Sequence, residues 1–161
     1  MTLAPDPPAP ETAAEVRLGG LARSLGFLLR IAQVRNFERF HARFEGMDLR
    51  PGEFSVLWVI RLNPGIRQGL LAQTLSIKPA QMTKVIRRLE DQGKLVRTIP
   101  EGDRRSVRLD LTGAGRAFVE ARRDDFLGAD DYHGDDLTPE ESRELARLLL
   151  KYSGTHFRAT E

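Results

Sequence analysis

The segment from residue 70 to residue 112 constrains the fold of this chain more than any other part of it. Its first half has apolar residues at three- and four-residue spacing, which predicts a short helix over residues 67–75 and a second helix after it. Pro79 suits the first turn of the second helix, and Gly93 suits the left-handed position that follows its last turn. We expect the two helices to bury Leu70, Leu71, Leu75, Met82, Val85, Ile86 and Leu89.

Two predicted strands follow, over residues 95–99 and 106–111. In the second run apolar and polar residues alternate, as in a half-buried strand, and residues 100–103 have the composition of a turn. A helix, a turn, a basic helix and a β-hairpin in this order predict a winged helix-turn-helix, a fold that commonly binds duplex DNA. The predicted fold class is mainly α with a small β-hairpin.

The flanking segments have too much apolar surface for a lone DNA-binding module. A long helix is predicted from residue 18 to residue 44, and its apolar side chains need a partner surface. Pro51 is expected to open the next helix, which Asn63-Pro64-Gly65 ends. Thr112 is expected to cap a later helix with Ala117, Phe118 and Ala121 inward. A capping box at residues 138–141 opens the last helix, whose apolar stripe is Leu145, Leu148, Leu149 and Tyr152.

These elements predict four regions along the chain. The first is a disordered Pro/Ala-rich tail over residues 1–17, which hold four of the nine prolines. An N-terminal helix and connection follow over residues 18–50, with either the same domain or a second subunit as the partner surface. The winged helix-turn-helix region covers residues 51–112, and C-terminal helices cover residues 113–161.

Composition limits the classes of protein to which this chain can belong. Its 30% of charged residues and mean hydropathy of −0.37 predict a soluble cytoplasmic protein with no membrane span and no signal peptide. The absence of cysteine excludes disulfides and thiolate metal sites. Residues 61–112 carry a net charge of +6 and residues 120–161 one of −5. Because the positive block coincides with the predicted helix-turn-helix, a polyanion is favoured as its partner.

Four motifs, taken in order, resemble the MarR (multiple antibiotic resistance regulator) family of bacterial transcription factors. They are the run SIKPAQMTKVIRRLE over residues 76–90, Gly93 with Val96-Arg97, Asp103-Arg104-Arg105 eight residues before Leu111-Thr112, and LTGAGR over residues 111–116. The resemblance covers roughly residues 20–155. It implies that the terminal helices within residues 18–50 and 113–161 are dimerisation helices, and that the homodimer they interlock binds a palindromic operator. In many members a small, often aromatic or phenolic, ligand releases the DNA, so we expect a repressor with such an effector.

The predicted recognition helix supplies the first candidate DNA contacts. Gln81 suits an adenine edge, whereas Lys84 and Arg88 suit guanine or phosphate. At the position of Arg87 the family often has an acidic residue that can pair with the wing arginine. A basic residue there removes this pairing and favours a phosphate contact. The full predicted set on this helix is Ala80, Gln81, Thr83, Lys84, Arg87 and Arg88.

The turn of the hairpin supplies the second candidate contact. A narrow minor groove concentrates negative potential and attracts an inserted arginine. The resemblance places Arg105 at this wing tip, next to Arg104, while Asp103 orients the arginines or caps the turn.

The sequence also offers candidates for a small-molecule crevice, but none for a metal site. The crevice candidates are Phe37, Phe40, His41, Trp58 and Arg61, with core packing as the alternative role of the aromatic residues. No cofactor and no metal are expected, because the three histidines do not form a metal-binding motif.

Two other functions stay open at this point. The chain could be an architectural DNA-binding protein without an effector, or a winged helix that docks onto another protein. A docking module would not need four basic residues on the predicted recognition helix and wing. An enzyme is the least favoured class, since the sequence has no phosphate loop, nucleophile motif or paired carboxylates in an apolar setting.

Overall fold

The computed structural model describes residues 12–13, 16–100, 106–127 and 137–155, and the chain divides into two compact units, residues 1–48 and 49–161. The first unit contains a 3-10 turn, η2 (Gly19–Arg23), and the helix α1 (Leu25–Arg43). The prediction of one helix from residue 18 is wrong at its start. Ser24 has an extended backbone, with ψ at 116°, and it separates the glycine-containing turn from α1.

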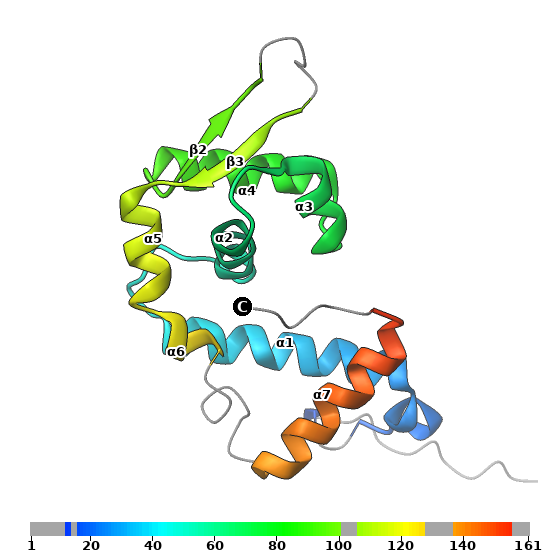
Figure 1. Ribbon diagram of the computed structural model, residues 1–161. Coiled ribbons are helices and arrows are strands. Elements are labelled where there is room, and N and C mark those ends of the chain that lie inside the picture. The colour runs from blue at the N-terminus through cyan, green and yellow to red at the C-terminus, as the bar shows by residue number, and fades with distance from the viewer. Residues whose placement is uncertain (1–11, 14–15, 101–105, 128–136, 156–161) are drawn as a thin grey trace, which may run out of the picture. The chain divides into compact units, whose positions relative to one another are not determined.

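The second unit has the predicted winged helix-turn-helix order, and the fold class is confirmed. Figure 1 shows α2 and α4 packed against a small antiparallel sheet, with α3 beside α4 and α5 beside α2. The strand order is β1-β3-β2. Sequence reasoning missed β1, because two residues are too few to show an alternating pattern. The elements are α2 (Glu53–Leu62), β1 (Ile66–Arg67), α3 (Gln68–Thr74), α4 (Pro79–Asp91), β2 (Leu95–Thr98), β3 (Arg108–Leu111), α5 (Gly113–Glu120), α6 (Arg123–Leu127) and α7 (Pro139–Ser153).

The core of the second unit lies between α2, α4 and the sheet. The stripe predicted for α4 is confirmed at three positions, since Met82, Ile86 and Leu89 have no exposed surface. The inward prediction for Leu70 is wrong, because its side chain is 47% exposed. Leu70 and Leu71 are neighbours about 100° apart around α3, so burying Leu71 turns Leu70 outward and brings Ala72 inward. The other fully or largely buried apolar side chains of this core include Phe54, Val56, Leu57, Ile60, Leu95, Leu109, Leu111 and Val119.

Two helix ends test the predictions made from proline and glycine. Gly93 has φ at 67° directly after the C-cap of α4, which confirms its left-handed role. Pro51, in contrast, lies in a turn before α2, so its prediction as the opening residue is wrong. Gly52 is the N-cap with φ at 84°, and a hydrogen bond from the Glu53 amide to the Arg50 carbonyl closes the turn.

The face that α5 turns inward also differs from the prediction. Gly115 and Val119 are buried, whereas Ala117 and Ala121 are exposed. The reason is a close approach of two backbones: a Cβ added at Gly115 would lie 1.8 Å from the carbonyl oxygen of Lys94. Only the face of α5 that carries glycine can approach the backbone just before β2 so closely.

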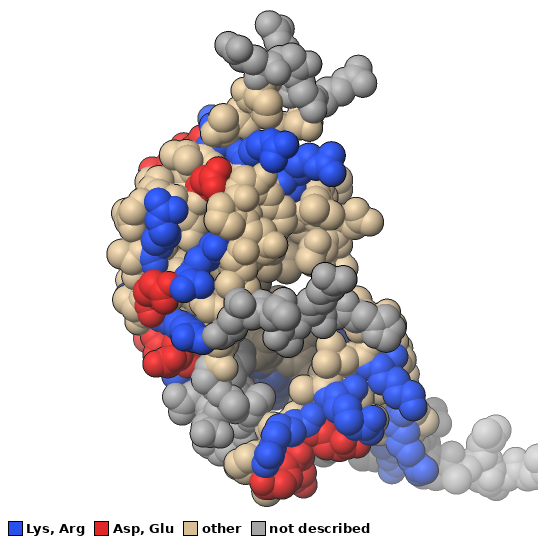
Figure 2. All heavy atoms as spheres, in the orientation of Figure 1, with Lys and Arg blue, Asp and Glu red and all other residues tan. Residues whose placement is uncertain are grey.

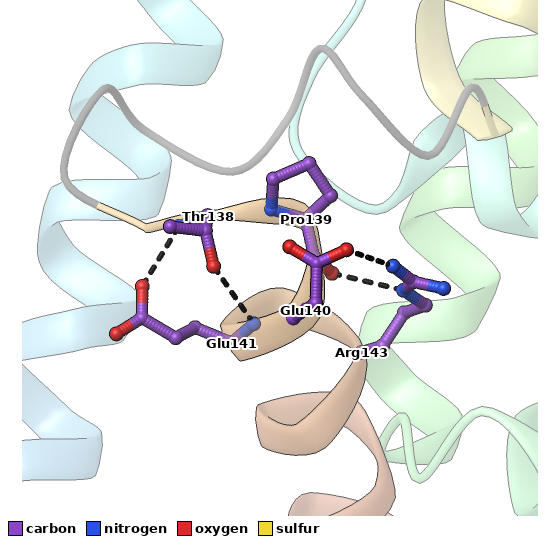
Figure 3. A network of polar contacts seen from close by, with 5 residues as sticks. All are labelled: Thr138, Pro139, Glu140, Glu141 and Arg143. Carbon is purple, nitrogen blue, oxygen red and sulfur yellow. Dashed lines mark hydrogen bonds and ion pairs between the residues drawn. The ribbon is translucent and has the colours of Figure 1, made fainter.

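The helix α7 begins with the capping box that the sequence predicts (Figure 3). The Thr138 hydroxyl accepts a hydrogen bond from the Glu141 amide at 3.2 Å, and the Glu141 carboxylate accepts one from the Thr138 amide at 2.8 Å. Arg143 adds a bond from its Nε to the Pro139 carbonyl at 3.1 Å and an ion pair with Glu140. These contacts satisfy the first turn of a helix whose apolar stripe is exposed at Leu145, Leu148, Leu149 and Tyr152. No helix in the described part of the chain is long and apolar enough to cross a membrane.

Candidate nucleic-acid interface

The outer face of α4 carries the predicted base- and phosphate-contacting side chains. Gln81, Lys84 and Arg87 are all exposed on this helix, as are Ala80 and Thr83. Within the described residues, neither Lys84 nor Arg87 takes part in an ion pair. An exposed helical face with cations that no carboxylate neutralises is what a polyanion requires.

Thr83 has a second role that the sequence did not suggest. Its hydroxyl donates a hydrogen bond to the Pro79 carbonyl at 3.0 Å, one turn earlier in α4. It also accepts a hydrogen bond at 3.1 Å from the side-chain amide of Gln68, at the start of α3. Thr83 therefore links the two helices of the helix-turn-helix.

Arg88 does not belong to this exposed face, and the prediction that placed it beside Gln81 and Lys84 is wrong. Its side chain is 22% exposed, and its Nε lies 3.0 Å from Oε1 of Glu53 on α2, which is 2% exposed. The second carboxylate oxygen of Glu53 accepts a hydrogen bond from the Arg50 amide at 2.8 Å. The contact with Glu53 therefore directs the Arg88 side chain toward α2. The pair anchors the recognition helix to the core.

The C-terminal end of α4 is tied to the sheet by a second ion pair. Arg97 on β2 pairs with Glu90 on α4. The hydrogen bond that the Arg97 guanidinium donates to the Glu90 carboxylate, with a smaller contribution from the negative charge of Glu90, raises the pKa of Arg97 above its usual value.

The wing is described at its base only. The tip residues Asp103, Arg104 and Arg105 lie outside the described residues. At the base, β2 pairs with β3 from Leu95 opposite Leu111 to Thr98 opposite Arg108. Figure 2 shows Lys and Arg side chains gathered at this part of the second unit, below the grey segment.

Sequence reasoning missed two arginines in this region, Arg67 and Arg108. Both are exposed, and they face one another across the β1 and β3 strands. Arg108 occupies an outward position in the predicted alternating strand, so its exposure was readable from the sequence. Its partner was not, because the sequence does not reveal the β1 strand.

The predicted crevice residues fall into two groups that the structure describes separately. Phe37 and His41 are exposed on α1 and Phe40 is buried there, in the first unit. In the second unit, the guanidinium of Arg61 lies 5.1 Å from the ring centroid of the half-buried Trp58.

Further aromatic and charged groups surround Trp58. Arg123 lies 5.9 Å from the same ring, and Phe54 stacks between Trp58 and Phe126 at 6.1 and 4.0 Å. Arg61 also pairs with Glu120. In the parts of the chain that the structure describes, no three His, Cys, Asp or Glu residues are grouped so that they could hold a metal ion.

Comparison with known proteins identifies the family. The family model described as MarR family matches residues 49–107, which include α2 to the base of the wing. A putative transcriptional regulatory protein for the hcr operon of Thauera aromatica is 38% identical over 111 residues, covering 67% of this chain and 66% of that protein. The HTH-type transcriptional repressor Rv2887 of Mycobacterium tuberculosis is 33% identical over 128 residues, covering 79% of this chain and 91% of the repressor.

Solved structures agree over most of the chain. The transcriptional repressor CouR bound to a 23-mer DNA duplex is 36% identical, with a TM-score of 0.70 over 87% of this chain and 96% of that one. CouR bound to p-coumaroyl-CoA is 32% identical, with a TM-score of 0.72 over 89% of this chain and 100% of that one. The winged helix-turn-helix, the exposed basic face of α4 and these matches establish that the chain belongs to the MarR family of transcriptional regulators.

Proposed function

We propose that this regulator acts as a homodimeric repressor that binds a palindromic operator with α4 in the major groove. The observation that carries the proposal is the exposed face of α4, where Lys84 and Arg87 have no ion pair among the described residues and Gln81 lies beside them. Cations of this kind suit backbone phosphates or guanine, and an amide suits an adenine edge. In this proposal Arg88 positions α4 through Glu53, and Arg105 enters the minor groove.

The proposed dimer is supported by exposed apolar residues on the terminal helices. Leu and Tyr side chains along α7 and Leu, Ile, Val and Phe side chains along α1 are each between 38% and 62% exposed. Soluble proteins rarely leave such long apolar stripes open to water. A symmetric dimer would cover them and would place two copies of α4 on half-sites about one helical turn apart. The residues are Leu25, Leu28, Ile31, Val34, Phe37, Leu145, Leu148, Leu149, Leu150 and Tyr152.

We also propose that a small aromatic effector releases the DNA. Support comes from the half-buried Trp58, whose ring centroid lies 5.1 Å from the guanidinium of Arg61 and 5.9 Å from that of Arg123. An aromatic ring with two cations beside it suits an aromatic ligand that carries a negative charge. CouR, which binds p-coumaroyl-CoA, is consistent with this class of effector. The contribution of Phe37, Phe40 and His41 to the same crevice stays a prediction.

Replacing Lys84 with alanine tests the proposed role of α4. The operator is first obtained by selecting bound duplexes from random DNA, and a palindrome is expected. The dimer loses two charged hydrogen bonds to phosphate, one on each half-site, so binding is expected to weaken about a hundredfold. The slope of log affinity against log salt should also fall by about 1.8, that is, about 0.9 for each lost contact. Fluorescence anisotropy from about 50 to about 200 mM salt measures both quantities. Arg116→Ala, an exposed charge loss on α5, is the control; a Lys84→Ala variant that behaves like this control would contradict the proposal.

Replacing Arg105 with alanine tests the proposed wing contact. An arginine in a narrow minor groove gains from the concentrated negative potential there, so its removal is expected to weaken operator binding about tenfold. The fold and the dimer should be unchanged, as judged by circular dichroism and sedimentation. Binding to an operator whose wing-contacted segment has been changed from A·T to G·C pairs should fall less in the variant than in the wild type. Equal affinities of variant and wild type for the selected operator would rule out the wing contact.

A further inference from the structure

Two arginines face one another across the short β1–β3 pairing, and no ion pair among the described residues neutralises them. Arg67 lies directly opposite Arg108 in the antiparallel register, and both are exposed. Residues opposite in such a pair project from the same face of the sheet with Cβ atoms about 5 Å apart. The ion pairs of the described residues include neither arginine. Like charges in this position destabilise the free protein, and a bound anion would remove the repulsion.

A hollow of about 370 Å³ adjoins this pair. Arg67 lines it together with Gln68 and Gly69 of α3 and Ser106 of the segment that leads into β3. The backbone amide of Gln68 donates a hydrogen bond to the Val107 carbonyl at 2.9 Å, which connects the start of α3 to the segment that leads into β3. The residues that line this recess include one with a side-chain amide, one with a hydroxyl and one with a guanidinium, and the recess is large enough for a phosphate group.

The turn before β1 contacts both Asp110 and Arg108 of β3. Oδ1 of Asp110 accepts a hydrogen bond from the Gly65 amide at 2.8 Å. Arg108 donates one from Nη1 to the Gly65 carbonyl at 3.3 Å, which leaves its other N–H groups available. A guanidinium that is already oriented loses less entropy when it binds a phosphate oxygen.

The hollow is also connected to the recognition helix. Gln68, which lines it, donates the hydrogen bond at 3.1 Å to Thr83 of α4. Thr83 and Arg87 are four residues apart and so lie on the same face of α4. Gln68 therefore connects the hollow to the helix face that carries Thr83 and Arg87.

We infer that Arg67 and Arg108, together with the hollow beside them, bind a backbone phosphate of the same DNA duplex that receives α4 in its major groove. The inference rests on the proposed DNA-binding function and adds a contact between the recognition helix and the wing. The site has the chemistry for a phosphodiester: two guanidinium groups supply the charge, and Gln68 and Ser106 supply neutral hydrogen bonds. It contributes affinity and orientation on the duplex, and it reads no base.

The test measures how the full-length variants Arg67→Gln, Arg67→Lys and Arg116→Gln bind the selected operator, each compared with the wild-type protein. Arg67→Gln removes one phosphate contact from each half-site, so it is expected to weaken binding about a hundredfold and to lower the salt slope by about 1.8. Arg67→Lys should retain most of the affinity, and Arg116→Gln should bind like the wild type. The free Arg67→Gln protein should melt no lower than the wild type, because a like-charge contact has been removed. Arg108→Gln should show the same loss of salt dependence.

The outcomes separate this inference from the proposed function. In one outcome Lys84→Ala weakens binding, but Arg67→Gln has the same affinity and salt slope as Arg116→Gln. This outcome would overturn the phosphate site and leave the proposed function standing. A wild-type protein that shows no salt-dependent binding to any selected duplex would overturn both. If Arg67→Gln melts at a lower temperature, and the fraction of protein that is unfolded at the assay temperature equals the fraction of binding lost, Arg67 stabilises the fold. This result would also overturn the phosphate site.

Discussion

Replacement of Gly115 with alanine is expected to destabilise the second unit by more than about 3 kcal/mol. The added Cβ would lie 1.8 Å from the carbonyl oxygen of Lys94 and 2.8 Å from its carbonyl carbon. Both atoms belong to the backbone, so no change of side-chain rotamer can relieve the overlap. Either the start of α5 or the Gly93–Lys94 turn must move.

Thr112 makes this movement costly. Its hydroxyl donates a hydrogen bond to the Gly93 carbonyl at 2.6 Å and accepts one from the Gly115 amide at 3.0 Å. Its own amide donates to the Lys94 carbonyl at 3.1 Å. A shift of α5 away from β2 therefore weakens the N-cap of α5 as well as its packing, and each loss adds about 1 kcal/mol.

Thermal unfolding followed by circular dichroism measures the effect. A loss of about 3 kcal/mol corresponds to a fall in melting temperature of roughly 6–12 °C for a chain of this size. Gly113→Ala is the matched control, because a Cβ at Gly113 meets nothing within 4 Å. The control should melt close to the wild type. If the two alanine variants melt together, the close approach of α5 to β2 is absent in solution.

Replacement of Glu53 with alanine is expected to cost about 3 kcal/mol of stability. The carboxylate is 2% exposed and has two partners, Arg88 at 3.0 Å and the Arg50 amide at 2.8 Å. Its removal takes this acceptor away from the partly buried guanidinium of Arg88 and from the Arg50 amide. Because Arg88 retains 22% exposure, water solvates part of its charge, which places the expected cost at the lower end for a broken buried pair.

Denaturant unfolding of a double-variant cycle separates this pair from general packing effects. Glu53→Met and Arg88→Met are each expected to lose stability, whereas the double variant should recover most of it, because no unpaired charge stays behind. Operator binding by the folded double variant should be retained in part, since Arg88 acts by positioning α4. Additive losses in the cycle would show that Glu53 and Arg88 do not interact, and complete loss of binding by a stable double variant would assign Arg88 to the DNA contact.

Local patterns predicted much of the site. Apolar residues at three- and four-residue spacing identified the buried stripe of α4, and the remaining positions placed Gln81, Lys84 and Arg87 outward. Gly93 and the capping box at Thr138 were predicted because helix ends have their own chemistry, which acts over three or four residues. These predictions depend only on near neighbours along the chain.

The errors share a different cause. Leu70 was placed inward and Ala117 and Ala121 were assigned to the core, although each is exposed. Arg88 was placed on the outer face although Glu53 draws it toward α2. In each case the hydropathy and spacing of the residues allowed more than one orientation of the helix about its own axis. Contacts from a distant part of the chain selected one of these orientations.

The sequence by itself therefore determined the order of the main helices and of the hairpin, the membership of a DNA-binding fold and the basic face of the recognition helix, because these follow from periodicity and local capping. Only the tertiary structure decided that Arg88 supports the core, that Gly115 sets the face of α5, and that Arg67 and Arg108 meet at the base of the wing. The residues of these contacts are 35, 21 and 41 positions apart. Their partners are chosen by packing and strand register, which no local pattern records.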